Sequence, residues 1–215
     1  MTESHHNRRE AVAVQKAAIF LGFVPWIVFS VVAGPSTWMW AALAALVCSL
    51  VLAVPDWRRS RSISILDVAA LLFFGVLVVL ALTLDRAALQ PIEDRAQLLS
   101  SIVIAIVAFG SLAVGRPFTE FYAKKETPRE YWNSPLFRQI NRVLTALWGG
   151  VFVLNALCDA AVAFWGANTD LFNWVIPIVV IVAAVKITGW YPDHVTGRSE
   201  THGAHEASVP PTRPA

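Results

Sequence analysis

Charged residues are scarce in this chain of 215 residues. Asp, Glu, Lys and Arg make up 15% of it, against 56% hydrophobic residues and a mean hydropathy of +0.57. A soluble globular domain carries about 25% charged residues, so the composition excludes that class. Long polar stretches are missing too, and the longest polar connection, residues 115–142, leaves no room for a water-soluble domain. Function is therefore expected in the apolar segments, in that connection or in the tails.

Cysteine and histidine are also rare. The two cysteines, Cys48 and Cys158, stand inside apolar stretches without CxxC spacing, which indicates small buried thiols. All five histidines lie near the chain ends, and no Ser, Cys or Asp pairs with a base at catalytic spacing. His202-x-x-His205 beside Glu206 has metal-like spacing, but no fold is predicted to hold these ligands. The sequence thus predicts no enzyme, no cofactor and no metal site.

Six apolar stretches dominate what is present. Each approaches the ~20 residues that a helix needs to cross a bilayer, and only helices satisfy their own backbone hydrogen bonds in lipid. The alternating pattern of membrane barrel strands is absent. The stretches are 17–33, 38–54, 63–84, 98–114, 143–165 and 171–188. We therefore predict an all-α integral membrane protein with six transmembrane helices.

The positive charges predict the orientation of these helices. Of the 17 Lys and Arg residues, only Arg86 and Arg95 fall on the side opposite to the amino terminus. Because short cytoplasmic loops are enriched in Lys and Arg, both termini are expected in the cytoplasm and the helices form three hairpins. A cleaved signal peptide over 17–33, ending at Val31-x-Ala33, is an alternative for the first stretch.

Three parts are predicted along the chain. Residues 1–16 form a disordered cytoplasmic amino terminus, residues 17–190 the bundle with a cytoplasmic interfacial loop at 115–142, and residues 191–215 a disordered tail. In the loop, Pro117 is expected in the first turn of a short helix, and Ser134-Pro135 at the start of the fifth span.

Aromatic and basic residues alternate in this loop. They predict either a docking surface for anionic lipid or a partner protein, or a solvated connector whose charges only fix the topology. No nucleic acid is expected as a partner, and nothing in the pattern indicates an oligomeric state. The predicted docking residues are Phe118, Phe121, Tyr122, Lys124, Lys125, Arg129, Tyr131 and Trp132.

Three ionisable residues fall inside the predicted spans: Asp67, Asp159 and Lys186. Such residues suggest function by default, because burying one at the bilayer centre costs at least ~2.5–3.5 kcal/mol. Asp67 and Lys186 lie at equal depth near the cytoplasmic side, which makes them a candidate ion pair. The alternative is that Lys186 reaches the headgroups alone.

Asp159 lies roughly 9 Å from the far end of the fifth span, at 1.5 Å per residue. At 100° per residue it falls within about 40° of one line with five other side chains of that span. This polar and aromatic seam must face other helices rather than lipid. Its residues are Asn141, Thr145, Trp148, Phe152, Asn155 and Asp159, with Asn173 of the sixth span at a similar depth.

Two interpretations of the seam remain open. In the first, Asp159 is a proton or ion site of a small transporter. In the second, the seam joins helices through hydrogen bonds worth ~0.6–2 kcal/mol each. Pro177 frees the backbone carbonyl of Asn173 as a possible acceptor. The second interpretation is favoured, because a transporter is expected to place further polar groups on several helices, and the second to fourth spans show few.

Several of these residues resemble a known family. FLGFVPWIVF at 20–29 is similar to the opening of the intracellular septation protein A family of bacterial inner-membrane proteins. Trp148, Asp159 and Phe164-Trp165 resemble that family's Trp, Asn and Phe-Trp in its penultimate span. Arg116-Pro117 and Asn173 resemble a basic-Pro step and an Asn-Phe-Lys motif. Asp159 and Val175 depart from the family's Asn and Lys.

The resemblance implies a multi-pass protein of the bacterial inner membrane that acts, without enzymatic activity, alongside other division or envelope proteins. Because the family carries Asn at position 159, it also implies that this position need not be ionised. We therefore predict a septation-type scaffold that works through protein or lipid contacts, with a proton- or ion-coupled transporter as the alternative.

Overall fold

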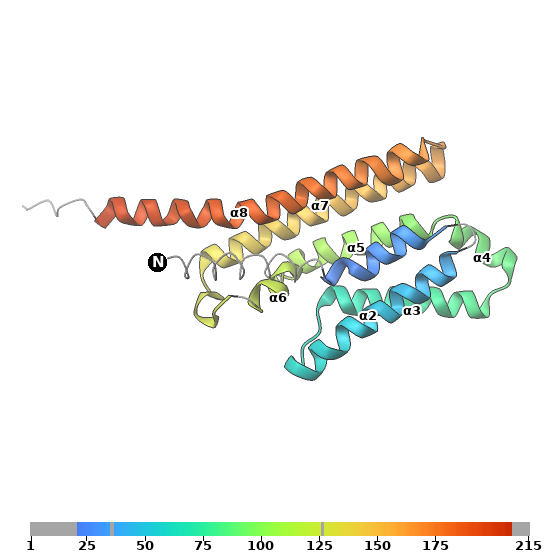
Figure 1. The fold of residues 1–215 in the computed structure, drawn as a ribbon, viewed down its shortest axis with the longest axis horizontal. Coiled ribbons are helices and arrows are strands. Elements are labelled where there is room, and N and C mark those ends of the chain that lie inside the picture. Colours follow the sequence, from blue (N-terminus) through green and yellow to red (C-terminus); the bar gives the residue numbers. More distant parts are fainter. Residues whose placement is uncertain (1–20, 35–36, 126, 208–215) are drawn as a thin grey trace, which may run out of the picture.

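The computed structural model describes residues 21–34, 37–125 and 127–207, and these residues form helices and connecting loops without a strand. Five helices are long and apolar enough to cross a membrane: α2 (Trp38–Ser60), α3 (Ile65–Thr83), α5 (Ala96–Ala113), α7 (Pro135–Trp165) and α8 (Ile176–Ala207) preceded by η2 (Leu171–Val175). Figure 1 shows them as an elongated bundle. The prediction of an all-α membrane protein is confirmed.

The first predicted span lies partly outside the described residues. Within them, Leu21–Val32 is an apolar helix, shorter than the other five. Residues 1–16, for which we predicted disorder, also lie outside them. The six-span count and the cytoplasmic location of both termini therefore stay predictions.

Three further short helices lie between the long ones in the described residues. α4 (Arg86–Glu93) connects α3 to α5 and was not predicted, although Asp85 caps it by accepting a hydrogen bond from the backbone of Ala88. α6 (Phe118–Lys124) and η1 (Arg129–Tyr131) lie in the connection before α7. The predicted short helix is present as α6, but Pro117 stands at its N-cap, directly before the first turn rather than in it.

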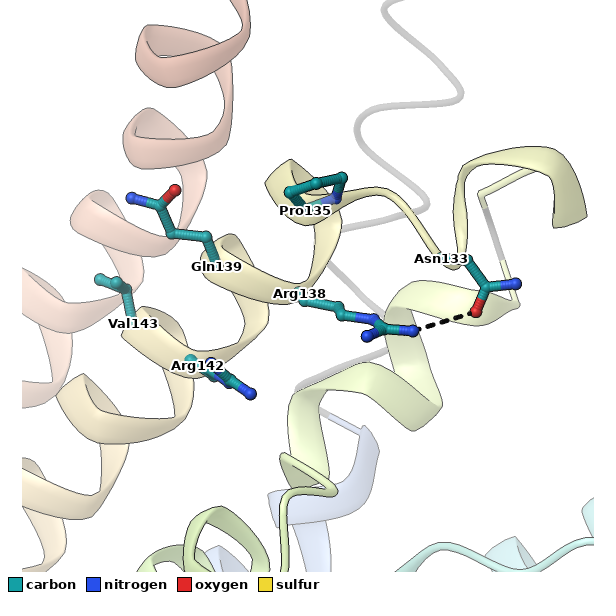
Figure 2. A pocket seen from close by; sticks show the side chains of 6 residues that line it. All are labelled: Asn133, Pro135, Arg138, Gln139, Arg142 and Val143. Atoms are coloured by element: carbon teal, nitrogen blue, oxygen red, sulfur yellow. Dashed lines mark hydrogen bonds between the residues drawn. The ribbon is translucent and has the colours of Figure 1, made fainter.

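The start of α7 follows directly from its sequence. The Ser134 side chain accepts a hydrogen bond from the backbone N–H of Phe137, and Pro135 occupies the first turn. This confirms Ser134-Pro135 as the start of the span, and α7 therefore takes in the last eight residues of the predicted 115–142 loop. Figure 2 shows this turn, with Arg138 and Arg142 on one side of α7 and Gln139 and Val143 on the other. Gly166 ends the helix in the left-handed conformation, at φ 61°.

α8 differs from the predicted tail. We expected no regular structure over 191–215, whereas the helix continues to Ala207, and residues 208–215 lie outside the described residues. Extending a formed helix costs much less than nucleating a new one. The apolar span therefore supplies a nucleus for the polar residues after Tyr191, and Pro192 is accommodated within the helix.

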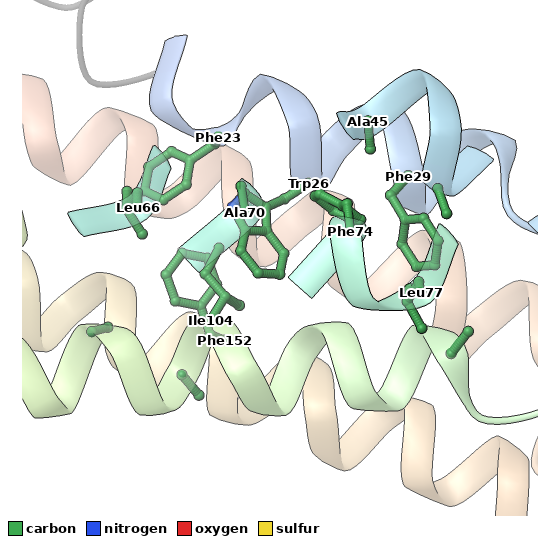
Figure 3. Close-up of a cluster of buried hydrophobic side chains, with 14 of the residues drawn as sticks. Phe23, Trp26, Phe29, Ala45, Leu66, Ala70, Phe74, Leu77, Ile104 and Phe152 are labelled. Carbon is green, nitrogen blue, oxygen red and sulfur yellow. The ribbon is translucent and has the colours of Figure 1, made fainter. Parts of the chain in front are cut away.

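α5 packs against α7, α2 against α3, and α7 against α8. Figure 3 shows the apolar core, where rings of the Leu21–Val32 helix meet those of α3 and α7. Trp26 and Phe74 have ring centroids 5.1 Å apart, and Phe23 and Trp148 4.8 Å. Such pairs contribute about 0.5–1.5 kcal/mol each. They fix the first helix against the bundle.

The outward faces of the helices are apolar. On α3, exposed side chains recur at helical spacing at Leu72, Val76 and Val79. Lipid tails provide the solvent for such a face, whereas water would penalise it. Several polar side chains of the spans, in contrast, are buried, among them Ser49, Ser100, Thr145 and Thr188.

Candidate functional site

The seam predicted on α7 faces the interior of the bundle. Asn141, Thr145, Trp148, Phe152 and Asp159 are buried, and Asn155 is half-buried. The seam divides into two halves on either side of Phe152. We call Asn141, Thr145 and Trp148 the Asn141 half, and Asn155 and Asp159 the Asp159 half.

In the Asn141 half, side chains are hydrogen-bonded to two other helices. The hydroxyl of Thr119 on α6 donates to the backbone carbonyl of Asn141 and lies 2.9 Å from the hydroxyl of Thr145. Because Thr119 has one proton to give, Thr145 is the donor of that second bond. The indole N–H of Trp148 donates to the hydroxyl of Thr188 on α8 at 3.1 Å. This half therefore holds α6, α7 and α8 together.

In the Asp159 half, the pairing is incomplete. The Ser101 hydroxyl on α5 donates to Oδ2 of Asp159 at 2.6 Å. Asn155 Oδ1, by contrast, is buried without a hydrogen-bond partner among the described residues. Asn173 Oδ1 on η2 and Trp26 Nε1 on the Leu21–Val32 helix are in the same state. Buried polar atoms without a partner cost about 1–3 kcal/mol each, so their grouping calls for an explanation.

The residues that carry these atoms line one cavity of about 240 Å³, which we call the seam cavity. It lies between the Leu21–Val32 helix, α5, α7 and the start of the last span. Its polar lining residues are Ser30, Gln97, Ser100, Ser101, Asn155, Asp159 and Asn173, and its aromatic ones are Phe23, Trp26, Trp148, Phe152 and Trp174. The structure thus places Asn173 beside the seam, as the sequence analysis grouped it.

Sequence reasoning missed the contribution of α5. We judged the second to fourth spans poor in polar groups, yet Gln97, Ser100 and Ser101 of the fourth line the seam cavity. Their spacing of three and four residues on one helix face was the available signal. Trp26 carried no signal, since an indole in an apolar stretch is ordinary.

The last span enters the cavity through a π-helical turn. In η2 the N–H of Ile176 donates to the carbonyl of Leu171, one residue further back than in an α-helix. Pro177 follows directly and cannot donate a hydrogen bond. We expected the freed Asn173 carbonyl as the acceptor for Asp159, but the described partner of Asp159 is Ser101. The turn instead brings the side chains of Asn173 and Trp174 to the cavity wall.

The structure does not bring the candidate ion pair together. Asp67 is buried at the start of α3, whereas Lys186 is exposed on α8. Ion pairs among the described residues join Lys124 to Glu120 and Lys125 to Asp56, each at 2.6 Å. The exposed position favours the alternative, in which Lys186 extends to the headgroups alone.

The predicted docking surface is only partly on the surface. Phe118 and Tyr122 are 1% and 3% exposed and belong to the core, so neither side chain is accessible to a partner. The α6 helix turns this face inward because Phe118 packs against Phe23 and the Tyr122 hydroxyl lies 2.9 Å from that of Ser64. Burial and the nearby Asp67 raise the pKa of Tyr122, so its hydroxyl stays protonated.

The other docking residues are accessible. Lys125, Arg129 and Tyr131 are exposed, and Phe121, Lys124 and Trp132 half-buried. Three of them, Phe121, Lys124 and Trp132, line a groove of about 740 Å³, which we call the basic groove. Its lining includes four basic residues and one acidic residue: Arg116, Lys124, Arg138, Arg142 and Glu120. Sequence analysis of the loop missed Arg138 and Arg142 because they stand on the first turns of α7 (Figure 2).

Cysteines and possible metal ligands are dispersed over the described residues. Cys48 and Cys158 are free thiols within α2 and α7. No three of His, Cys, Asp and Glu come together in the part of the chain that the structure describes. His202 and His205 lie on α8, and their side chains are outside the described set.

A curated protein is similar to this chain. The inner membrane-spanning protein YciB of Sodalis glossinidius (strain morsitans) is 26% identical to it over 148 residues, which cover 68% of this chain and 78% of the relative. The distant septation-type resemblance is confirmed. Together with the five long apolar helices, it identifies the chain as a multi-pass protein of the inner membrane. No family model and no solved structure match the chain.

Proposed function

We propose that the chain is a non-enzymatic, septation-type scaffold of the inner membrane, which works by contact with other division or envelope proteins. The resemblance to an inner membrane-spanning protein supports the class. The basic groove supports the mode of action, because it gathers cationic and aromatic side chains from three separate elements into one hollow.

The position of the groove suits a docking site at the membrane surface. Gly115 follows the end of α5, Ile65 begins α3 and Arg138 stands on the first turn of α7, so the groove lies where three spans end. Basic residues at such ends favour the cytoplasm, and we therefore orient the groove and both chain termini to that side of six spans.

The net positive charge of the groove indicates the charge of its partner. Four cations face one acid, and Lys124 lies over the Trp132 ring at 5.4 Å while also pairing with Glu120. Single exposed ion pairs contribute at most about 1 kcal/mol, but several charges in one hollow act together. We infer that the occupant is an acidic segment of another envelope protein, with Tyr131 and Trp132 at the rim.

Crosslinking in living cells tests this proposal. A photoreactive amino acid replaces Tyr131, which is 55% exposed, and the matched control replaces Trp40 at the opposite end of α2. We expect protein adducts from position 131 and not from position 40. The adducts should be lost in Arg138→Gln/Arg142→Gln and retained in Arg86→Gln, which removes an exposed charge elsewhere. Recovery of lipid alone from position 131 would reject a protein partner.

The seam cavity favours a second candidate, a small proton- or ion-coupled transporter with Asp159 in its path. The polar lining that we expected of a transporter is present on several helices. Its test is a pH-dependent flux in proteoliposomes, which Asp159→Asn should abolish. A flux unchanged by that substitution would remove Asp159 from the path.

A further inference from the structure

The seam cavity has a composition that packing does not require. Helix packing in membranes favours small residues and satisfied hydrogen bonds. Here three residues that each carry a buried polar atom without a partner among the described residues, on three different helical segments, line one hollow. Trp26 is only 4% exposed, so bulk water or lipid headgroups do not reach its N–H.

Of the three unpaired polar atoms of the residues that line the cavity, two are acceptors and Trp26 Nε1 is a donor. Asn155 and Asn173 each contribute an unpaired carbonyl oxygen, and Asp159 contributes a carboxylate that is 8% exposed and receives one described hydrogen bond. Two amide oxygens and a carboxylate match a group that donates several hydrogen bonds and carries a positive charge. An ammonium group has three such donors.

The rest of the wall is aromatic and apolar. The rings of Phe23, Trp148 and Phe152 contact one another, and Trp26 and Trp174 add two further rings to the lining. Aromatic faces attract cations, with Trp the strongest, and the gain grows when the cation is desolvated. The volume of about 240 Å³ lies below the ~300–1,000 Å³ of pockets for drug-sized ligands. The cavity therefore suits a small ligand with an apolar body.

Two other ligand classes fit less well. Divalent metals need several carboxylate, imidazole or thiolate ligands, and Asp159 is the sole such side chain among the described residues of the lining. A phospholipid headgroup brings a phosphate, yet no described lining residue is Lys or Arg. A free organic cation needs neither.

We propose that the seam cavity binds a small free organic monocation, an ammonium group on an apolar body, with Asp159 as the counter-ion. Asn155 and Asn173 accept the remaining ammonium hydrogens, and the aromatic wall contacts the body. Ser101 is a positioning residue, because its hydroxyl holds the Asp159 carboxylate at the cavity wall. The π-helical turn η2 carries Asn173 and packs against α7. The basic groove takes no part in this binding, so the inference is independent of the proposed partner docking.

The test measures, by calorimetry, the equilibrium binding of benzylamine to the full chain in detergent micelles. Benzyl alcohol serves as the neutral probe of the same shape. We expect saturable binding of benzylamine, at least tenfold tighter than that of benzyl alcohol. Asp159→Asn should weaken benzylamine binding at least tenfold, Asn155→Ala and Asn173→Ala a few-fold each. Asp170→Asn, which removes an exposed acid at the same end of the bundle, should leave it unchanged.

Folding of every variant is checked by its thermal unfolding in the same detergent. The inference is overturned if the folded wild-type chain fails to bind benzylamine, which would mean that the cavity holds water only. Equal binding of benzyl alcohol, or equal binding by a folded Asp159→Asn variant, would also overturn it. If position 131 gives no protein adducts while benzylamine still binds, the scaffold proposal is rejected and the cavity proposal is not.

Discussion

The two halves of the α7 seam contain similar residues, but their polar groups are hydrogen-bonded to different extents. In the Asn141 half, Thr145 and Trp148 find partners on α6 and α8. In the Asp159 half, Asn155 and its neighbours Trp26 and Asn173 leave atoms unpaired around a cavity. A satisfied polar group stabilises a bundle, whereas an unsatisfied one costs stability and is retained for another reason. Stability and binding are thus separated along a single helix.

The largest expected effect comes from the junction of the halves. A Cβ on Gly149 would lie 2.9 Å from the Phe109 ring of α5, so Gly149→Val should push α5 from α7 and lower the free energy of unfolding by about 1–3 kcal/mol. Gly150→Val is the control, because a Cβ there meets nothing within 4 Å. Unfolding in mixed micelles measures both. Equal losses would show that α5 does not approach α7 at Gly149.

A smaller effect is expected within the Asn141 half. Thr145→Val keeps the shape of the side chain and removes its hydrogen bond to Thr119. The free energy of unfolding should fall by about 1 kcal/mol. Thr83→Val is the control, since the Thr83 hydroxyl bonds only to the Val79 carbonyl of its own helix. An undiminished stability of Thr145→Val would contradict the role of this half as the joint between helices.

The smallest effects are expected at Asp159. Asp159→Asn keeps an acceptor for Ser101, so the melting temperature in detergent should stay within about 2 °C, which corresponds to less than ~1 kcal/mol. Asp159→Leu leaves the Ser101 hydroxyl without its partner and should lower the melting temperature by a few degrees. A drop with Asn as large as that with Leu would show that the charge itself stabilises the bundle.

Most of the fold could be predicted from local features of the sequence. The apolar stretches located five long helices, and Ser134-Pro135 located the start of α7 because capping depends on neighbouring residues. The inward face of the seam followed from helical periodicity. The helical course of α8 past residue 191 was missed, because polar composition alone does not show whether an adjoining helix continues.

The candidate site was less predictable, since it depends on distant pairs. Ser101 and Asp159 are 58 residues apart, as are Ser64 and Tyr122. Helical spacing shows which side chains share a face but not what that face meets. For the same reason Phe118 and Tyr122 were assigned to the surface, although α6 turns them into the core. Asp67 was paired with Lys186, although Asp67 is buried and Lys186 exposed.

One pair of variants tests the contrast most directly. Trp148 and Trp26 are both buried indoles, but only Trp26 has an N–H without a partner. The free energies of unfolding of Trp148→Phe and Trp26→Phe are measured in the same mixed micelles, so that the same substitution is compared at both positions. We expect Trp148→Phe to lose at least about 1 kcal/mol more, because it alone gives up a hydrogen bond between helices. An equal or larger loss for Trp26→Phe would contradict the division of the seam into a joint and a binding site.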